Sequence, residues 1–302
     1  MSYPKLSPTQ PLRPRPQAAT CGVASLLASI LVAAAPAFSQ QSDPEGRHQE
    51  AMARQHGEES PEATAATVPA PAMPVMGAEL GLGPERLGYF AQPYAPVEAR
   101  PELPGIVVLH EWWGLNDNVR AMADRLAGEG YLVLAVDLYA GETAETPERA
   151  RTLMQQASAD PDALLAQVAK AAALLRTQHR ATGVAVLGWC FGGGWSLQTA
   201  LRLPGEVDAA VVYYGRVVTD REQLAALDDP LLGLFGGADE GIPVDDVRRF
   251  AGLLEELDKD ATIEIYEGAA HAFANPSGER YDAQAAEDAW RRTLEFLRRT
   301  LG

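Results

Sequence analysis

The chain has 302 residues, and its hydrophobic content of 47% excludes a wholly disordered protein. A formal net charge of −16 argues against nucleic acid as a partner, because phosphate binding needs clustered lysine and arginine. Two cysteines are too few for a disulfide-stapled scaffold. Most of the prolines precede residue 105 and all the tryptophans follow it, so the folded core is expected in roughly the last 200 residues.

The first 39 residues have the three parts of a secretory signal peptide. Lys5, Arg13 and Arg15 are the only charged residues among them, an apolar run follows at 21–35, and small residues end the segment. That run is shorter than the roughly 20 residues that a membrane-spanning helix needs. We therefore expect an exported protein, periplasmic or extracellular. The alternative is an uncleaved leader that anchors the protein in a membrane.

Residues 40–84 are rich in alanine, proline, glutamate and glutamine and have no apolar periodicity, which predicts a solvated linker. The expected organisation is a signal peptide over 1–39, this linker, and a folded domain over 85–302. Cleavage of the leader would take the formal charge from −16 to −19 and would leave Cys190 as the only cysteine. A single cysteine in an exported protein is either a buried, inert side chain or a functional one.

From residue 105 onward, short apolar runs alternate with amphipathic stretches. Strands are expected at 105–110, 131–137, 183–188, 206–215, 230–237 and 261–268. Helices are expected at 116–130, 147–157, 161–179, 192–202, 243–258 and 281–300. Strands that are apolar throughout and alternate with helices predict a parallel sheet covered on both faces. In such sheets the functional residues follow the carboxyl ends of the strands.

The clearest candidate follows the third of these strands. Gly188, Cys190 and Gly192 form the pattern G-x-C-x-G between a strand and a helix, which is the form of a nucleophile elbow with sulfur in place of the usual hydroxyl. The backbone N–H of Phe191 would point toward an oxyanion, and the dipole of the next helix would favour a thiolate. The alternative is an ordinary glycine-rich turn.

An acid and a histidine follow the fifth and sixth strands. Asp239 and His271 come after Cys190 in the order nucleophile, acid, histidine, which is the order of an α/β-hydrolase triad. His271 would transfer protons, and Asp239 would orient its ring and stabilise the imidazolium. Glu240 and Asp245 are nearby alternatives, as is Asp246, but Asp239 follows the strand end most directly.

The loop after the first strand reads His110-Glu111-Trp112-Trp113-Gly114. A zinc motif H-E-x-x-H would need histidine at position 114, so that interpretation fails. The backbone N–H of Trp112 is the candidate second oxyanion donor. Glu111 would project into the site, where apolar surroundings favour its neutral form and let it exchange a proton with a thiol. Trp112 and Trp113 are either core residues or an aromatic substrate wall.

Taken together, these segments resemble the dienelactone hydrolase family. The matching stretches are HEWWGLNDNVR, GYLVLAVDLYAG, GWCFGG, VVYYG, GGADEGIP and HAFANPSGERYDAQAAEDAWRRTLEFL. The resemblance implies an α/β-hydrolase fold, with a mostly parallel central sheet and helices on both faces, and a hydrolase without a metal or other cofactor. It further implies that Glu111 holds the Cys190 thiol until substrate binds. The thiolate then attacks a lactone carbonyl, and water releases the acyl group from the resulting thioester.

One departure concerns the substrate. The family's best-known member binds a substrate carboxylate with arginines, one of them four residues after the histidine, where this chain has Asn275. Arg151 is the candidate for the other arginine, with Arg149 as an alternative. We assign Trp113 and Tyr214 to the substrate pocket together with Asn275 and Arg151. The net negative charge would repel anionic substrates at long range. We therefore expect this chain to share the family's reaction type more than its dienelactone substrate.

The sequence therefore predicts a carboxymethylenebutenolidase-like, thiol-dependent hydrolase of a small lactone or carboxylic ester, acting as a monomer. The alternative from another class is a non-catalytic or weakly catalytic binding protein on a hydrolase scaffold. A redox role for Cys190 would need a resolving thiol, which the cleaved chain would lack.

Overall fold

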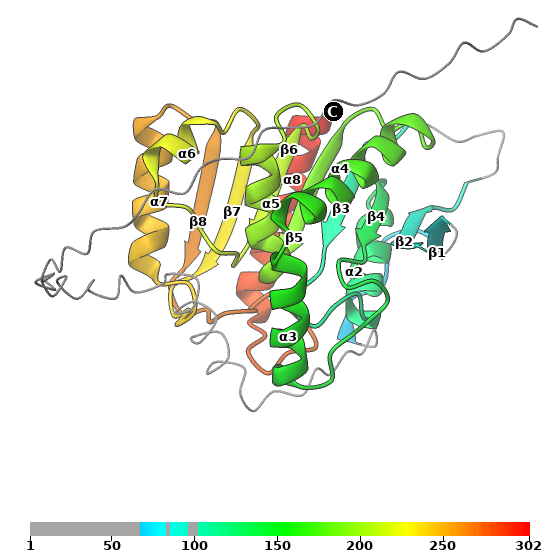
Figure 1. Cartoon of the computed structure of the whole chain (residues 1–302), viewed down its shortest axis with the longest axis horizontal. Coiled ribbons are helices and arrows are strands. Elements are labelled where there is room, and N and C mark those ends of the chain that lie inside the picture. Colours follow the sequence, from blue (N-terminus) through cyan, green and yellow to red (C-terminus); the bar gives the residue numbers. More distant parts are fainter. Residues whose placement is uncertain (1–66, 83–84, 96–101) are drawn as a thin grey trace, which may run out of the picture. The chain divides into compact units, whose positions relative to one another are not determined.

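The computed structural model describes residues 67–82, 85–95 and 102–302. Within these ranges, strands form one sheet in the order β1-β2-β4-β3-β5-β6-β7-β8 (Figure 1). The strands are β1 (Val75–Leu82), β2 (Glu85–Pro93), β3 (Gly105–Leu109), β4 (Leu132–Val136), β5 (Val184–Trp189), β6 (Ala209–Tyr213), β7 (Leu231–Gly236) and β8 (Ala261–Tyr266). Strands β3 to β8 run parallel, whereas β1 and β2 pair antiparallel. The predicted mostly parallel sheet is confirmed.

Both faces of the sheet are covered by helices. Successive side chains of a strand point to opposite faces, so Val107 and Leu109 of β3 belong to one hydrophobic cluster and Ile106 and Val108 to another. The helices are α2 (Asp117–Ala127), α3 (Pro147–Ser158), α4 (Pro161–Thr177), α5 (Phe191–Arg202), α6 (Arg221–Ala225), α7 (Val244–Glu256) and α8 (Ala283–Leu301). Side chains from α3, α4, α5 and α7 fill the first cluster, and those from α2 and α8 fill the second.

Several helices begin where capping residues in the sequence place them. The side chains of Asn116, Thr146 and Asp160 each accept a hydrogen bond from the N–H three residues later, at 3.0 to 3.3 Å. These bonds satisfy one of the free N–H groups at the start of α2, α3 and α4. Gly128 follows the last residue of α2, in agreement with the predicted end of that helix.

Three elements differ from the sequence prediction. Residues 75–82, which we assigned to the end of the linker, form β1, and the neighbouring β2 was not expected either. The reason is that β1 is an edge strand whose side chains over 75–81 are exposed or only half-buried, so hydrogen bonds to β2 define it rather than an apolar alternation. The short helix α6, capped by Asp220, was also missed.

The leader and most of the predicted linker lie outside the described residues, so the signal peptide stays a prediction. Among the helices of the described ranges, none is both long enough and apolar enough to cross a membrane.

Candidate active site

The candidate residues gather because their strands are parallel. The loops that carry Glu111, Cys190, Asp239 and His271 follow β3, β5, β7 and β8, and the carboxyl ends of parallel strands lie at one edge of a sheet. Residues separated by 160 positions in the sequence can therefore meet there.

The turn between β5 and α5 is a tight elbow. Cys190 has φ 53° and ψ −114°, a backbone conformation that is strained for a residue with a side chain. A Cβ on Gly188 would lie 2.1 Å from the carbonyl oxygen of Gly192, and a Cβ on Gly192 would lie 2.2 Å from that of Leu109. Both positions thus require glycine for steric reasons. The strand, turn and helix predicted around Cys190 are present.

Backbone hydrogen bonds fix Cys190 directly before the first N–H group of α5. The N–H of Cys190 donates to the carbonyl of Tyr213 at 3.0 Å, and the carbonyl of Cys190 accepts from Gly194 at 3.1 Å. Phe191 is the first residue of α5, so its N–H has no acceptor within the helix. Cys190 is a buried, free cysteine with 6% of its surface exposed.

Asp239 and His271 form a buried hydrogen-bonded pair. His271 Nδ1 lies 2.7 Å from Asp239 Oδ2, and each side chain is 1% exposed. The other oxygen, Oδ1, accepts hydrogen bonds from the N–H groups of Gly241 and Ile242 at 2.8 and 2.9 Å. Both oxygens of Asp239 thus accept hydrogen bonds, and the predicted choice of Asp239 over its acidic neighbours agrees with this geometry.

Electrostatics favour the charged forms of this pair. Burial would raise the pKa of Asp239, but the charge and hydrogen bond of His271, with the two N–H donors, lower it below its ordinary value. Burial would likewise lower the pKa of His271. The charges of Asp239 and Cys190, with hydrogen bonds to both side chains, outweigh that effect and raise the pKa of His271 to about 10. The imidazole is therefore bound to Asp239 through Nδ1, and the charge of Cys190 also acts on it.

Glu111 lies in the same site, 7% exposed. Its Oε1 accepts a hydrogen bond from the Tyr214 hydroxyl at 3.3 Å, and its Oε2 accepts one from the side-chain amide of Asn275 at 2.7 Å. Tyr214 has φ 35°, and its ring lies edge-on to that of His271 at 5.2 Å between centroids. Tyr214 and Asn275, which we predicted to line the substrate pocket, thus hold the extra carboxylate.

The other residues predicted to line the pocket differ in how deeply they are buried. Trp112 and Trp113 are buried, 1% and 6% exposed, with their ring centroids 4.9 Å apart. This packing makes both of them part of the core as well as of the loop that carries Glu111. Arg151 lies half-buried on α3, and its Nε is buried without a hydrogen-bond partner in the described ranges. The alternative Arg149 pairs with Glu142 at the surface.

His110 has a supporting role that the sequence did not reveal. Its Nε2 accepts a hydrogen bond from the N–H of Leu138 at 3.2 Å, so its Nδ1 is the nitrogen that donates to the carbonyl of Glu111, at 2.6 Å. Burial lowers the pKa of His110 to about 4, which keeps the ring neutral and preserves this tautomer. The ring thereby ties the loop after β3 to the loop after β4. Its place directly before Glu111 was the only signal in the sequence.

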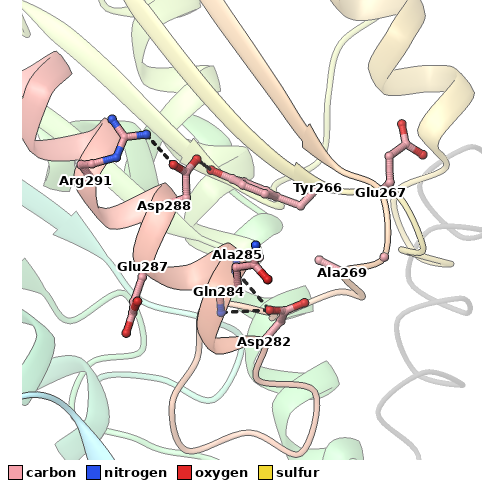
Figure 2. A pocket seen from close by; sticks show the side chains of 10 residues that line it. Tyr266, Glu267, Ala269, Asp282, Gln284, Ala285, Glu287, Asp288 and Arg291 are labelled. Carbon is pink, nitrogen blue, oxygen red and sulfur yellow. Dashed lines mark hydrogen bonds and ion pairs between the residues drawn. The ribbon is translucent and has the colours of Figure 1, made fainter.

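A hollow lies away from these side chains, between the end of β8 and the start of α8 (Figure 2). Its volume is about 710 Å³, and Asp282 and Asp288 are among the residues that line it. Asp282 accepts hydrogen bonds from the first N–H groups of α8, and Asp288 accepts one from Tyr266 and pairs with Arg291. None of the candidate catalytic side chains is among its lining residues. In the described ranges, no group of three or more side chains is arranged to hold a metal ion.

The sheet, the elbow and the ordered acid–histidine pair define the α/β-hydrolase fold. A solved structure with this fold is brefeldin A esterase, described as a bacterial homologue of human hormone sensitive lipase, with a TM-score of 0.55. It covers 87% of this chain and 88% of its own at 18% identity, so the likeness is one of fold.

Within that fold class, the chain belongs to the dienelactone hydrolase family, which matches residues 88–301. A protein of Saccharolobus solfataricus named "Putative carboxymethylenebutenolidase" is 33% identical, in a match that covers 67% of this chain and 92% of that protein. The crystal structure of a "Putative Dienelactone Hydrolase" from Klebsiella pneumoniae has a TM-score of 0.66 and 27% identity, and covers 74% of this chain and 99% of its own. The resemblance read from the sequence motifs is confirmed.

Proposed function

We propose that the protein is a thiol-dependent hydrolase of a lactone or carboxylic ester, with Cys190 as the nucleophile. The observation that carries this proposal is the 2.7 Å contact between His271 and Asp239, whose other oxygen accepts two backbone hydrogen bonds, beside a cysteine on a strained elbow. A structural cysteine needs neither the strained turn nor a neighbouring, oriented imidazole.

The reaction follows from these positions. His271 takes the proton of the Cys190 thiol, and the thiolate forms a C–S bond to the substrate carbonyl carbon while the π electrons move to oxygen. The N–H groups of Phe191 and Trp112 would stabilise that oxyanion. Its collapse breaks the bond to the alcohol oxygen, which takes the proton from His271. A water molecule, deprotonated by His271, then attacks the thioester, and the C–S bond breaks to restore the thiol.

The same network bears on the substrate class. Asn275 is uncharged and already donates to Glu111, so it is not placed as a cation that would pair with a substrate carboxylate. The formal charge of −16 also repels anions at long range. We therefore propose uncharged esters or lactones as substrates. We also propose that the protein is exported through residues 1–39.

The proposal is tested by measuring hydrolysis of a panel of uncharged esters and lactones before and after stoichiometric alkylation of the thiol. The protein with residues 40–302 keeps Cys190 as its only cysteine, so the reagent has one target. We expect the protein to hydrolyse members of the panel and alkylation to abolish this activity. Saturation with substrate beforehand should protect the thiol from the reagent. Turnover that survives complete alkylation would overturn the proposal. So would the combination of an unreactive thiol and no turnover of any substrate in the panel.

Glu111 is expected to assist proton transfer from the thiol. The substitution Glu111→Gln keeps the size of the side chain but removes the carboxylate, and should lower kcat/KM by about 10²-fold, in the range of general acid–base effects. The measurement is kcat/KM against pH, together with the unfolding temperature. Glu111→Asp, which keeps a carboxylate, should retain the shape of the profile. An unchanged profile in Glu111→Gln would contradict the role, and an equal loss of thermal stability in both variants would make Glu111 a structural residue.

A further inference from the structure

The loop after β4 brings one more polar group to the nucleophile. Tyr139 lies three residues beyond the end of β4. Its ring packs edge-on against that of His110, at 4.6 Å between centroids, and in a tilted arrangement against that of Phe191, at 5.8 Å. Phe191 directly follows the candidate nucleophile. The backbone of Tyr139 is fixed too, because its N–H donates to the side chain of Asp137 at 3.0 Å and its carbonyl accepts from Glu142 at 3.2 Å.

The hydroxyl of this fixed ring is buried and lacks a hydrogen-bond partner in the described part of the chain. Tyr139 is 5% exposed, so bulk water does not explain the missing partner. Equally buried tyrosines have one: Tyr213 shares a hydrogen bond with Thr293 at 2.7 Å, and Tyr214 donates to Glu111. Buried polar groups are normally paired, and an exception calls for an explanation such as a ligand-binding role.

The place of this ring beside Phe191, the residue next to Cys190, gives that explanation. The hydroxyl makes no hydrogen bond to Cys190, yet the two side chains interact electrostatically. Burial, and then the negative charge of Cys190, raise the pKa of Tyr139 well above its ordinary value, so the hydroxyl keeps its proton and remains a donor. Because the ring packs against that of Phe191, the residue next to Cys190, and the hydroxyl makes no hydrogen bond to sulfur, this donor can serve an atom of a group attached to sulfur.

We propose that the Tyr139 hydroxyl donates a hydrogen bond to the acyl carbonyl oxygen of the substrate that Cys190 attacks, as a third donor beside the N–H groups of Phe191 and Trp112. This assignment rests on the proposed hydrolase function. The hydrogen bond strengthens as the oxygen gains negative charge, so it stabilises the tetrahedral intermediate more than the bound substrate.

The decisive variant is Tyr139→Phe, which removes only the hydroxyl. Because that hydroxyl has no hydrogen-bond partner among the residues that the structure describes, its loss should leave the unfolding temperature unchanged or raised. We expect kcat/KM to fall 10- to 100-fold for every ester or lactone that the wild type hydrolyses, and kcat to fall with it. The matched control is Tyr89→Phe, whose hydroxyl donates to Asp124 at 2.9 Å. It should lower the unfolding temperature and leave kcat/KM unchanged.

A second measurement does not depend on turnover. A trifluoromethyl ketone accepts the Cys190 thiolate at its carbonyl carbon, which forms a C–S bond and an oxyanion while the thiol proton stays on His271. Its dissociation constant is obtained from protection of the thiol against iodoacetamide. We expect Tyr139→Phe to weaken this adduct 10- to 100-fold without changing the alkylation rate of the free protein.

The two measurements separate this inference from the proposed function. Hydrolysis that is thiol-dependent in the wild type and equal in Tyr139→Phe would overturn the Tyr139 assignment alone, as would an equally tight ketone adduct. A wild-type thiol that forms no ketone adduct would overturn both. A fall in activity matched by a fall in unfolding temperature would make Tyr139 a structural residue and would also overturn the assignment.

Discussion

Replacing Cys190 with alanine is expected to abolish hydrolysis, with kcat falling by about 10⁶-fold, the scale on which loss of the nucleophile slows a triad enzyme. Without sulfur no acyl-enzyme forms, and the oxyanion donors that remain can only assist slow attack by water. The measurement is the initial rate at saturating substrate, at enzyme concentrations high enough to detect a residual rate. Cys190→Ser keeps an attacking atom and should retain more activity than Cys190→Ala.

The fold should survive this substitution. Cys190 is buried but small, and alanine has the same backbone restrictions at φ 53°, so the unfolding temperature of Cys190→Ala should stay close to that of the wild type. Cys190→Gly offers the matched comparison, because glycine adopts positive φ without strain. It should be as inactive as the alanine variant but more stable, by about 1 kcal/mol or more. Residual activity near the wild-type rate in either variant would exclude Cys190 as the nucleophile.

The parts of this site that could be read from the sequence are those encoded by neighbouring residues. The elbow needs glycines at fixed offsets from Cys190, and a Cβ at Gly188 or Gly192 would fall within 2.2 Å of a carbonyl oxygen. Helix caps such as Asn116 act on an N–H three residues away. Apolar runs mark buried parallel strands. In each case the physical constraint is local, so a short stretch of sequence carries it.

The parts that could not be read depend on contacts between distant residues. The hydrogen bonds of Tyr214 and Asn275 to Glu111 span 103 and 164 positions, and no local pattern specifies them. The neutral ring of His110 and the unpaired hydroxyl of Tyr139 become visible only once burial is known. The edge strand β1 was not predicted for the opposite reason. Little of it is buried, and its pairing with β2 alone defines it.

These distant contacts also bear on what Glu111 does before substrate binds. Both of its carboxylate oxygens accept hydrogen bonds from neutral donors, while the charge of Cys190 contributes to the raised pKa of His271. In this arrangement the histidine, rather than the glutamate, is the first group placed to take the thiol proton. The family resemblance implied that Glu111 holds the thiol. The pH profile of Glu111→Gln therefore tests this part of the mechanism most directly.

The second large effect is expected for Asp239→Asn, which should lower kcat by about 10⁴-fold, as for the orienting acid of a triad. The amide cannot fix the His271 tautomer or stabilise the imidazolium. Without the charge of Asp239, burial weighs more heavily on the pKa of His271, which should fall from about 10. Alkylation of Cys190 at pH 7 should then slow, because less of the thiol proton resides on His271. Glu240→Gln, an exposed neighbour, is the matched control and should leave both rates unchanged.

The pair of Asp239 and His271 also predicts how the unfolding free energy changes with pH. The pKa of His271 is raised from 6.5 to about 10, so its contribution is complete below pH 6.5 and is lost as the pH rises through 10. The pKa of Asp239 is lowered from 3.8, so its contribution is present above pH 3.8 and is lost as the pH falls through the folded-state value. The wild type should therefore exceed Asp239→Asn in unfolding free energy most between about pH 4 and 6.5, as measured by denaturant titration. A difference that grows steadily above pH 7 would mean that the pair does not carry opposite charges in the folded protein, and His271 would then meet the thiol as a neutral base.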